Sequence, residues 1–246
     1  MLRLLTAIPV HNEEKYIAGV LEETLEIVPE VLVVDDGSQD ATPEILRRFP
    51  QVRVLRHVVN EGYGAALRDA FRYAVQHGFD ALVTLDCDRQ HQPSLIPRLV
   101  RHLTEADIVS GSRYLVPPPP EAQIPPERRR INVLITTLLN SLLGFDLTDA
   151  FCGFKAYRVD VLRRIEIIDT GYAMPLEVWV QAACYGWTIK EISVPVIYLD
   201  EERAFGGALD DPTTRLRYYL DVLQAALARW CPEKLPAGDR NEVIAE

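Results

Sequence analysis

Cysteine is scarce in this sequence, and its spacing excludes one class of metal site. Four cysteines occur among 246 residues, and no two of them lie close together along the chain. Zinc sites built from paired cysteines are therefore excluded. The five histidines form no cluster either, so we assign none of them to a metal. We expect the four cysteines to be reduced packing residues of a cytosolic protein: Cys87, Cys152, Cys184 and Cys231.

Basic residues are outnumbered by acidic ones. The chain carries 26 Lys and Arg against 36 Asp and Glu, a formal net charge of -10. A nucleic-acid-binding face needs clustered Lys and Arg to neutralise phosphates, so we expect no nucleic-acid partner.

Long apolar runs are also absent. The first ten residues, MLRLLTAIPV, form too short an apolar stretch for a signal peptide and predict a buried strand. No run approaches the roughly 18 apolar residues needed to cross a bilayer. We therefore expect a cytoplasmic location.

The sequence does contain a regular alternation of apolar runs and helical spacing. Apolar runs predict strands at residues 4–10, 31–34, 52–55, 81–85 and 107–109. Between them apolar residues recur at intervals of three or four, as at Ile17, Val20 and Leu21. This alternation predicts an α/β fold, with a Rossmann-like, mostly parallel sheet flanked by helices. The length suits one large domain or two tightly joined lobes.

A proline-rich segment at residues 117–126 (PPPPEAQIPP) interrupts this pattern and predicts a hinge or mobile loop. The apolar helix expected at 131–143 has apolar residues around much of its circumference, so it is buried or faces a lipid or a partner. Further strands are expected at 154–157 and 189–198, and further helices at 176–185 and 212–230. We divide the chain into residues 1–115, 116–210 and 211–246, the last being a C-terminal helix and tail.

Polar residues cluster where three predicted strands end. Residues 9–13 follow the first strand, 35–38 the second, and 86–88 the fourth. Ligands bind beyond the carboxyl ends of the strands in such sheets, so the three clusters predict one site.

Two of these clusters supply paired carboxylates. Asp86 and Asp88 form an Asp-x-Asp motif whose hard oxygens suit Mg²⁺ or Mn²⁺ shared with a diphosphate, and Gln90 could add a carbonyl oxygen. The alternative is that Asp-x-Asp only caps the helix beginning at Pro93. Asp35 and its neighbours have an equally ordinary alternative as turn residues.

The motifs, taken in order, resemble those of the glycosyltransferases of family 2, and within them the polyprenyl (dolichyl) phosphate sugar synthases. The resemblance covers residue 6 to about 207. It rests on IPVHNEE (8–14), VVDDGSQDAT (33–42), NEGYGAALRDAF (60–71), TLDCDRQHQP (84–93), SGSRY (110–114), DAFCGFKAYR (149–158), GYAMPLE (171–177) and EISVPVIYLDEER (191–203).

The resemblance implies an A-type glycosyltransferase fold that binds a nucleotide-diphospho-sugar, GDP-mannose or UDP-glucose, in residues 1–115. It implies that Asp86 lies near the ribose and diphosphate and that Asp88 and Gln90 hold Mg²⁺ or Mn²⁺. It further implies a nucleoside pocket lined by Pro9, Asn12, Glu13 and Asp36.

The same resemblance assigns an acceptor-binding half to residues 116–210. It implies a lipid-phosphate acceptor held by Arg113 and one of Arg129 or Arg130, with Glu177 facing the sugar and Arg203 closing over the diphosphate. It also implies a single displacement with inversion. Arginine forks suit phosphate oxygens. A phosphate acceptor is already an anion and needs no base.

One loop departs from the family pattern. After Arg203 the lipid-phosphate members carry Gly, a hydroxyl and a basic residue, whereas residues 204–209 read AFGGAL. Three hypotheses therefore stay open. The chain transfers a hexose to a polyprenyl phosphate, with peripheral contact at the cytoplasmic membrane face. Alternatively it uses a soluble hydroxyl acceptor, for which Glu177 and then Asp149 are the candidate bases. The third is a nucleotide-sugar-binding protein without catalysis.

Overall fold

The computed structural model describes residues 2–119, 122, 124–197 and 206–235. Its strands are β1 (Leu4–Val10), β2 (Val31–Asp35), β3 (Arg53–Arg56), β4 (Ala81–Thr84), β5 (Ile108–Ser112), β6 (Lys155–Arg158) and β7 (Ile189–Ser193). Its α-helices are α1 (Ile17–Ile27), α2 (Thr42–Leu46), α3 (Tyr63–Gln76), α4 (Ile96–His102), α5 (Pro126–Leu143), α6 (Val159–Leu162), α7 (Met174–Tyr185) and α8 (Pro212–Trp230). Short 3-10 helices cover Pro93–Leu95, Gly207–Asp210 and Pro232–Lys234.

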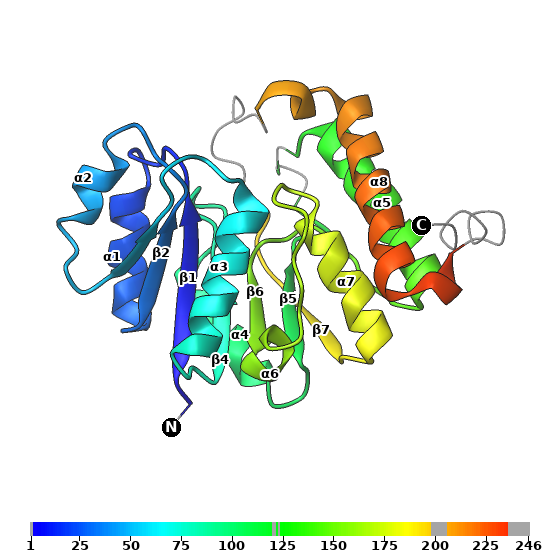
Figure 1. The fold of residues 1–246 in the computed structure, drawn as a ribbon, viewed down its shortest axis with the longest axis horizontal. Helices are drawn as coiled ribbons and strands as arrows, with labels where there is room; N and C mark the ends of the chain where they lie inside the picture. Colours follow the sequence, from blue (N-terminus) through cyan, green and yellow to red (C-terminus); the bar gives the residue numbers. More distant parts are fainter. Residues whose placement is uncertain (1, 120–121, 123, 198–205, 236–246) are drawn as a thin grey trace.

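The seven strands form one sheet in the order β3-β2-β1-β4-β6-β5-β7 (Figure 1). Every neighbouring pair is parallel except the two that involve β6, which runs antiparallel to β4 and β5. The predicted α/β fold with a mostly parallel sheet is therefore confirmed. The strand expected at residues 189–198 is shorter than predicted, because β7 ends at Ser193.

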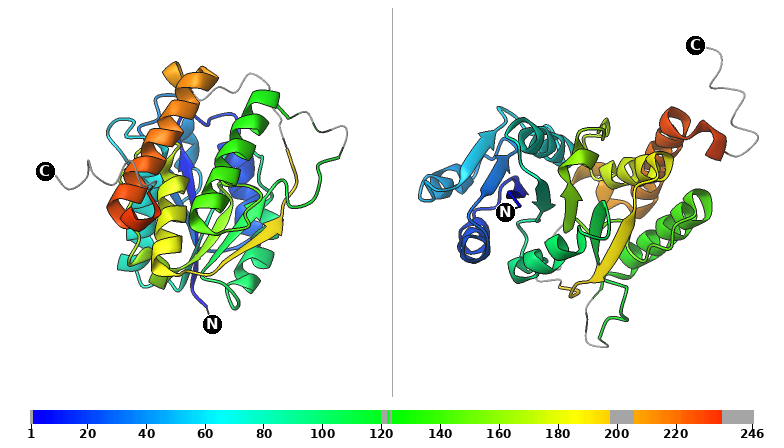
Figure 2. Two further views of the ribbon diagram at one scale, coloured as in Figure 1. Left: turned by 90° about the vertical axis from the view of Figure 1, so that its right-hand side faces the viewer. Right: turned by 90° about the horizontal axis from the view of Figure 1, so that it is seen from below.

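Each face of the sheet carries its own apolar core. Side chains alternate along a strand, so Leu32 and Val34 of β2 enter one core while Val31 and Val33 enter the other. Helices α3, α5, α7 and α8 contribute to the first core, and α1, α2 and α4 to the second. Figure 2 shows this layering from the side and from below. The sheet is thus covered on both faces, and its carboxyl edge stays available for a site.

The helix expected from residue 131 begins earlier, at Pro126, and packs against α7 and α8. Its buried face includes Ile131, Ile135 and Leu139, whereas Val133 and Leu134 are exposed. Among the described residues, no helix combines the length and apolarity that a membrane span requires.

The expectation that all four cysteines are reduced is wrong for two of them. Cys184, at the end of α7, and Cys231, just after α8, form a disulfide with a Cα–Cα distance of 5.9 Å. They are 47 residues apart in sequence, so only the packing of α7 against α8 brings them together. Cys87 and Cys152 are buried and belong to no disulfide, as predicted for reduced packing residues.

Candidate active site

A cavity of about 620 Å³ opens at the carboxyl edge of the sheet. Its size falls within the range usual for small-molecule sites. The loops after β1, β2, β4 and β5 line it, together with side chains from α3, α5 and α8. The residues in its lining that were predicted from sequence are Pro9, Glu13, Asp36, Asp86, Asp88, Gln90 and Arg113.

Asn12 lies beside the cavity and joins two of its loops. Its backbone is left-handed, with φ of 57°, and its side-chain carbonyl accepts hydrogen bonds from the N–H groups of Gln39 and Asp40. Its own N–H donates to the hydroxyl of Ser38 at 2.9 Å. Asn12 thus fixes the loop after β1 against the loop after β2, and its predicted contact with a nucleoside stays a prediction.

Asp36 is buried, and its carboxylate organises the loop that enters α3. One oxygen accepts the N–H of Glu61 at 2.8 Å and the other accepts the N–H of Gly62 at 2.8 Å. Nδ1 of His57 is hydrogen-bonded to Asp36 at 2.7 Å, and Nε2 to Asp69 at 3.1 Å. Carboxylate oxygens accept hydrogen bonds, so protonated His57, with a donor on each ring nitrogen, suits both partners. The sequence alone did not single out His57.

Burial lowers the pKa of His57, but Asp36, Glu61 and Asp69 outweigh that effect and raise it above the usual 6.5. A raised folded-state pKa stabilises the fold below about pH 6.5, and this contribution is lost as pH rises through the folded-state value. We expect His57→Gln to lower the free energy of unfolding by roughly 2 kcal/mol at pH 6, and by less at pH 9. Urea denaturation of both proteins at the two pH values measures this. A loss of unfolding free energy in His57→Gln that is larger at pH 9 than at pH 6 would contradict the raised pKa of His57.

Asp86 is clamped from two sides. Tyr63 of α3 donates its hydroxyl to Oδ1 of Asp86 at 2.9 Å, and the Tyr63 ring stacks on Tyr172 at 5.6 Å. On the other side, a Cβ at Gly153 would lie 2.2 Å from Oδ2 of Asp86. The carboxylate is therefore held between a hydroxyl and a glycine backbone at the wall of the cavity.

Asp88 is not the residue that directly precedes the 3-10 helix at Pro93. Its Oδ1 accepts the backbone N–H of Gln90 at 3.0 Å, and the residue preceding that 3-10 helix, Gln92, makes no side-chain cap bond. Arg89 adopts φ of 59° between them, so the chain turns back on itself after Asp88. The turn brings Asp86, Asp88 and Gln90 to one cavity wall. Their donors are all oxygens, which fits a hard divalent cation such as Mg²⁺ or Mn²⁺.

The predicted acceptor-phosphate arginines have different surroundings. Arg113 lines the cavity and forms a fork with the buried carboxylate of Asp149. Arg129 instead stacks over the Tyr114 ring at 3.6 Å, and Arg130 is exposed; neither lines the cavity. Arg128 does line it, although the sequence analysis did not select that arginine. The predicted roles of Arg129 and Arg130 therefore stay predictions.

Glu177 and Arg203 were also predicted from the family resemblance. Glu177 is buried in α7 outside the cavity lining, and its carboxylate accepts the backbone N–H groups of Ile168 and Asp169. This arrangement supports the segment before α7, while its predicted place at the sugar stays a prediction. Arg203 lies outside the described residues, so its predicted closing role also stays a prediction.

Two cavity residues from α8 escaped the sequence analysis because the helix showed only an amphipathic pattern. Arg215 is 3% exposed, lines the cavity and donates Nη1–H to the carbonyl of Leu209 at 2.7 Å. Tyr219 also lines the cavity, and its ring packs against Phe151 with centroids 4.7 Å apart. The signal available in the sequence was the spacing of Arg215, which lies four residues before Tyr219 and eight before Leu223, on the apolar face of the expected helix.

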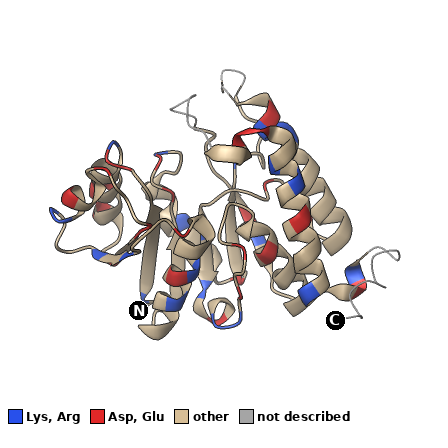
Figure 3. Ribbon diagram, turned by 45° about the horizontal axis from the view of Figure 1, so that its top comes forward, with Lys and Arg blue, Asp and Glu red and all other residues tan. Residues whose placement is uncertain are grey.

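The charged side chains that line the cavity come from two groups of elements, which we call its acidic end and its basic end. Carboxylates follow the central strands, whereas Arg113, Arg128 and Arg215 come from the end of β5, α5 and α8. Figure 3, which brings the carboxyl edge of the sheet forward, shows both signs of charge around it. The acidic end suits a cation and the basic end suits an anion. The carboxylates of the acidic end are Glu13, Asp36, Asp86 and Asp88.

Comparison with known proteins shows what this arrangement is similar to. A model of glycosyl transferase family 2 matches residues 6–166. An undecaprenyl-phosphate mannosyltransferase from Micrococcus luteus is 33% identical over 240 residues, covering 93% of this chain and 96% of the relative. A dolichyl-phosphate hexose transferase from Haloferax volcanii is 32% identical, covering 81% of this chain and 83% of the relative.

Solved structures share the fold. A crystal structure of glucosyl-3-phosphoglycerate synthase from Mycobacterium tuberculosis, in complex with Mn²⁺, UDP and phosphoglyceric acid, superposes with a TM-score of 0.70. Its sequence is 20% identical to this one, and the match covers 92% of this chain and 78% of the synthase chain. The predicted A-type glycosyltransferase fold is thereby confirmed.

Proposed function

This chain belongs to glycosyl transferase family 2 and is a glycosyltransferase, and we propose that it moves a hexose from a nucleotide-diphospho-sugar to a polyprenyl phosphate. The reaction forms a bond between an acceptor phosphate oxygen and the anomeric carbon, and breaks the bond from that carbon to the diphosphate. We propose a single displacement, which inverts the anomeric centre.

The two-ended charge of the cavity is the observation that carries this proposal. A nucleotide diphosphate bound with its cation suits the acidic end, and a second anion, the acceptor phosphate, suits Arg113 and Arg128 at the basic end. A neutral hydroxyl acceptor would not need arginines there. The relatives named as undecaprenyl-phosphate and dolichyl-phosphate transferases support a lipid-phosphate acceptor.

Asp88 and Gln90, with Asp86 beside them, are the residues that would hold Mg²⁺ or Mn²⁺. The cation, when bound, stabilises the negative charge that develops on the leaving diphosphate. The chain itself positions both anions. Tyr63 holds the carboxylate of Asp86 beside the proposed site of the cation, with which the diphosphate would bind, and Arg113 directs the acceptor phosphate. Because that phosphate is already ionised at neutral pH, no base is needed to activate it.

Calorimetric binding of GDP and of UDP, each with Mn²⁺ and again with EDTA, tests the donor half of the proposal. We expect one nucleotide to bind, and to bind only with the metal. The acceptor half is tested by incubating the protein with polyprenyl phosphate in detergent and a labelled donor. The donor is GDP-mannose if GDP binds, and UDP-glucose if UDP binds. Sugar label should then enter the organic extract. Label that stays in water-soluble products would favour the soluble hydroxyl acceptor instead.

We also propose peripheral contact with the cytoplasmic membrane face through an apolar patch beside the basic end. Its four side chains are between 43% and 57% exposed: Leu115, Val116, Val133 and Leu134. Arg129 of α5 stacks on Tyr114, so the segment that leads to Leu115 and Val116 contacts α5 about one turn before Val133 and Leu134. Exposed Arg130 adds a positive charge that suits anionic headgroups.

Sedimentation with vesicles containing an anionic phospholipid tests this contact. We expect the protein to pellet with the vesicles, and Val133→Asp combined with Leu134→Asp to lower the bound fraction severalfold, because charges on a membrane-facing surface are costly to bury. The matched control is Ile27→Asp, at a half-exposed apolar position on α1, which should bind like wild type. An equal loss of vesicle binding in the double variant and in Ile27→Asp would contradict the location of the patch.

A further inference from the structure

We infer that Asp149 is a positioning residue, which orients the guanidinium of Arg113 toward the acceptor phosphate and takes no part as a base. The inference rests on the proposed function, because it assigns Arg113 to the acceptor. It excludes the alternative that Asp149 activates a hydroxyl acceptor.

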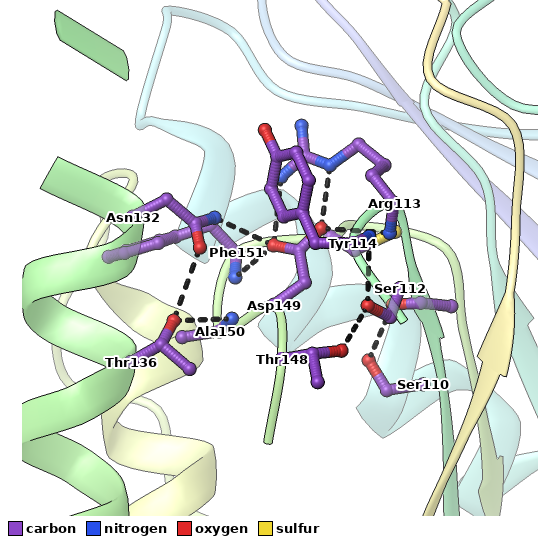
Figure 4. Close-up of polar contacts among 12 residues, drawn as sticks. Ser110, Ser112, Arg113, Tyr114, Asn132, Thr136, Thr148, Asp149, Ala150 and Phe151 are labelled. Carbon is purple, nitrogen blue, oxygen red and sulfur yellow. Dashed lines mark hydrogen bonds and ion pairs between the residues drawn. The ribbon is translucent and has the colours of Figure 1, made fainter. Parts of the chain in front are cut away.

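The pair has the geometry of a fork. Arg113 donates Nε–H to Oδ2 of Asp149 at 2.7 Å and Nη2–H to Oδ1 at 3.0 Å, as Figure 4 shows. The backbone N–H of Arg113 also donates to Oδ2 at 3.2 Å. The side chain of Asp149 is fully buried and that of Arg113 is 17% exposed. The two bonds from the guanidinium to one carboxylate leave it few orientations, and Arg113 lines the cavity.

Asp149 is itself fixed by α5. Asn132 donates its amide N–H to Oδ1 of Asp149 at 2.7 Å, and its own carbonyl accepts the hydroxyl of Thr136 at 3.2 Å. The Thr136 hydroxyl in turn accepts the N–H of Ala150 at 3.1 Å (Figure 4). The backbone N–H of Phe151 donates to Oδ1 at 3.2 Å. The carboxylate therefore cannot turn away from Arg113.

A second carboxylate, that of Glu191, supports the segment that carries Asp149. Glu191 of β7 accepts the N–H of Asp149 at 3.1 Å and the N–H and hydroxyl of Thr148, each at 2.8 Å. The Thr148 hydroxyl also bonds the hydroxyl of Ser112, next to Arg113, at 2.5 Å. The ends of β5 and of the 144–150 loop are thus tied to β7. Arg113 is held by a buried network that spans three elements.

The same contacts explain why Asp149 is unsuited to accept a proton. Burial alone would raise the pKa of its carboxyl, but Arg113 and Asn132 lower it to about 2. Both oxygens are already occupied by donors from the chain. A base must take a proton from its substrate, and this carboxylate is neither available nor basic enough.

A double-mutant cycle tests the inference. We expect Asp149→Asn to raise the KM for polyprenyl phosphate roughly tenfold to hundredfold, while the Kd of the nucleotide changes less than about twofold. In a background of Arg113→Gln, which has already lost the fork, Asp149→Asn should have little further effect. A carboxylate that acts only on stability would change both KM and nucleotide Kd, or neither. An equal effect of Asp149→Asn in both backgrounds would overturn the inference.

Asn132→Leu provides a second measurement if Asp149→Asn fails to fold. It removes one donor to Asp149 and keeps the charge pair, so we expect a smaller rise in the acceptor KM that again disappears in the Arg113→Gln background. If Asn132→Leu raised the acceptor KM equally in the Arg113→Gln background, the inference would also be overturned. Wild-type transfer to polyprenyl phosphate is measured first. Its absence would defeat the proposed function, whereas additive mutants in an active enzyme would defeat only the role of Asp149.

Discussion

Asp88→Ala is expected to lower turnover roughly a thousandfold while the protein stays folded. Asp88 supplies a carboxylate to the acidic end of the cavity, where we propose the cation to bind. A bound divalent cation contributes several kcal/mol of charge stabilisation, and each 1.36 kcal/mol corresponds to a tenfold change in rate. Loss of Asp88 should also abolish the difference between nucleotide binding with Mn²⁺ and with EDTA. Turnover assays and calorimetry on the same preparation measure both effects.

The control separates this role from a general effect of losing an acidic residue. Asp160 of α6 has a side chain 82% exposed and forms only a surface ion pair with Arg163, so Asp160→Ala should keep wild-type turnover. Thermal unfolding of both variants should match the wild type closely, because Asp88 is partly exposed at a loop. Wild-type turnover by Asp88→Ala would remove the metal assignment.

The sequence predicted the elements of this fold more completely than their arrangement. The strand at residues 31–34 and the helix at 212–230 follow from local apolar spacing, and both are present within a residue. The antiparallel direction of β6 depends on contacts with β4 and β5, which no local pattern encodes. The same limit explains why the bond between Cys184 and Cys231 was missed.

For the site, the sequence indicated the correct edge of the sheet but not where each side chain points. Asp36 and Asp86 follow strands, and that position alone brings them to the cavity. Glu177 lies in a helix, where the direction of the side chain depends on packing, and its carboxylate is directed toward backbone N–H groups outside the cavity lining. His57 was missed because its two carboxylate partners, Asp36 and Asp69, are distant in sequence.

Gly153 shows how a residue without a side chain can determine the position of a functional carboxylate. A Cβ at this position would lie 2.2 Å from Oδ2 and 2.8 Å from Cγ of Asp86. The backbone has little freedom to retreat. Thr84 donates its hydroxyl to the carbonyl of Gly153 at 2.5 Å, and the carbonyl of Phe154 accepts the N–H of Gly111 at 2.8 Å. The carboxylate of Asp86 must therefore move.

We expect Gly153→Ala to lower kcat/KM roughly a hundredfold, because a displacement of about 1 Å at a reacting site costs that much. Overpacking should also lower the free energy of unfolding by about 1–3 kcal/mol. Steady-state kinetics and urea denaturation measure the two effects. Nucleotide affinity in the presence of Mn²⁺ should fall as well, because Asp86 moves away from the acidic end of the cavity.

Gly19→Ala is the matched control for Gly153→Ala. Gly19 lies in α1, and its Cβ would meet the Arg89 guanidinium at an ordinary contact distance of 3.8 Å. Alanine in a helix interior is favoured over glycine by roughly 0.5–1 kcal/mol, so this variant should be slightly more stable and fully active. If Gly153→Ala also kept its turnover and nucleotide affinity, the carboxylate of Asp86 could occupy another position without cost. The contact with Gly153 would then be a packing feature of the fold, and Asp86 would lose its place among the groups that the reaction requires.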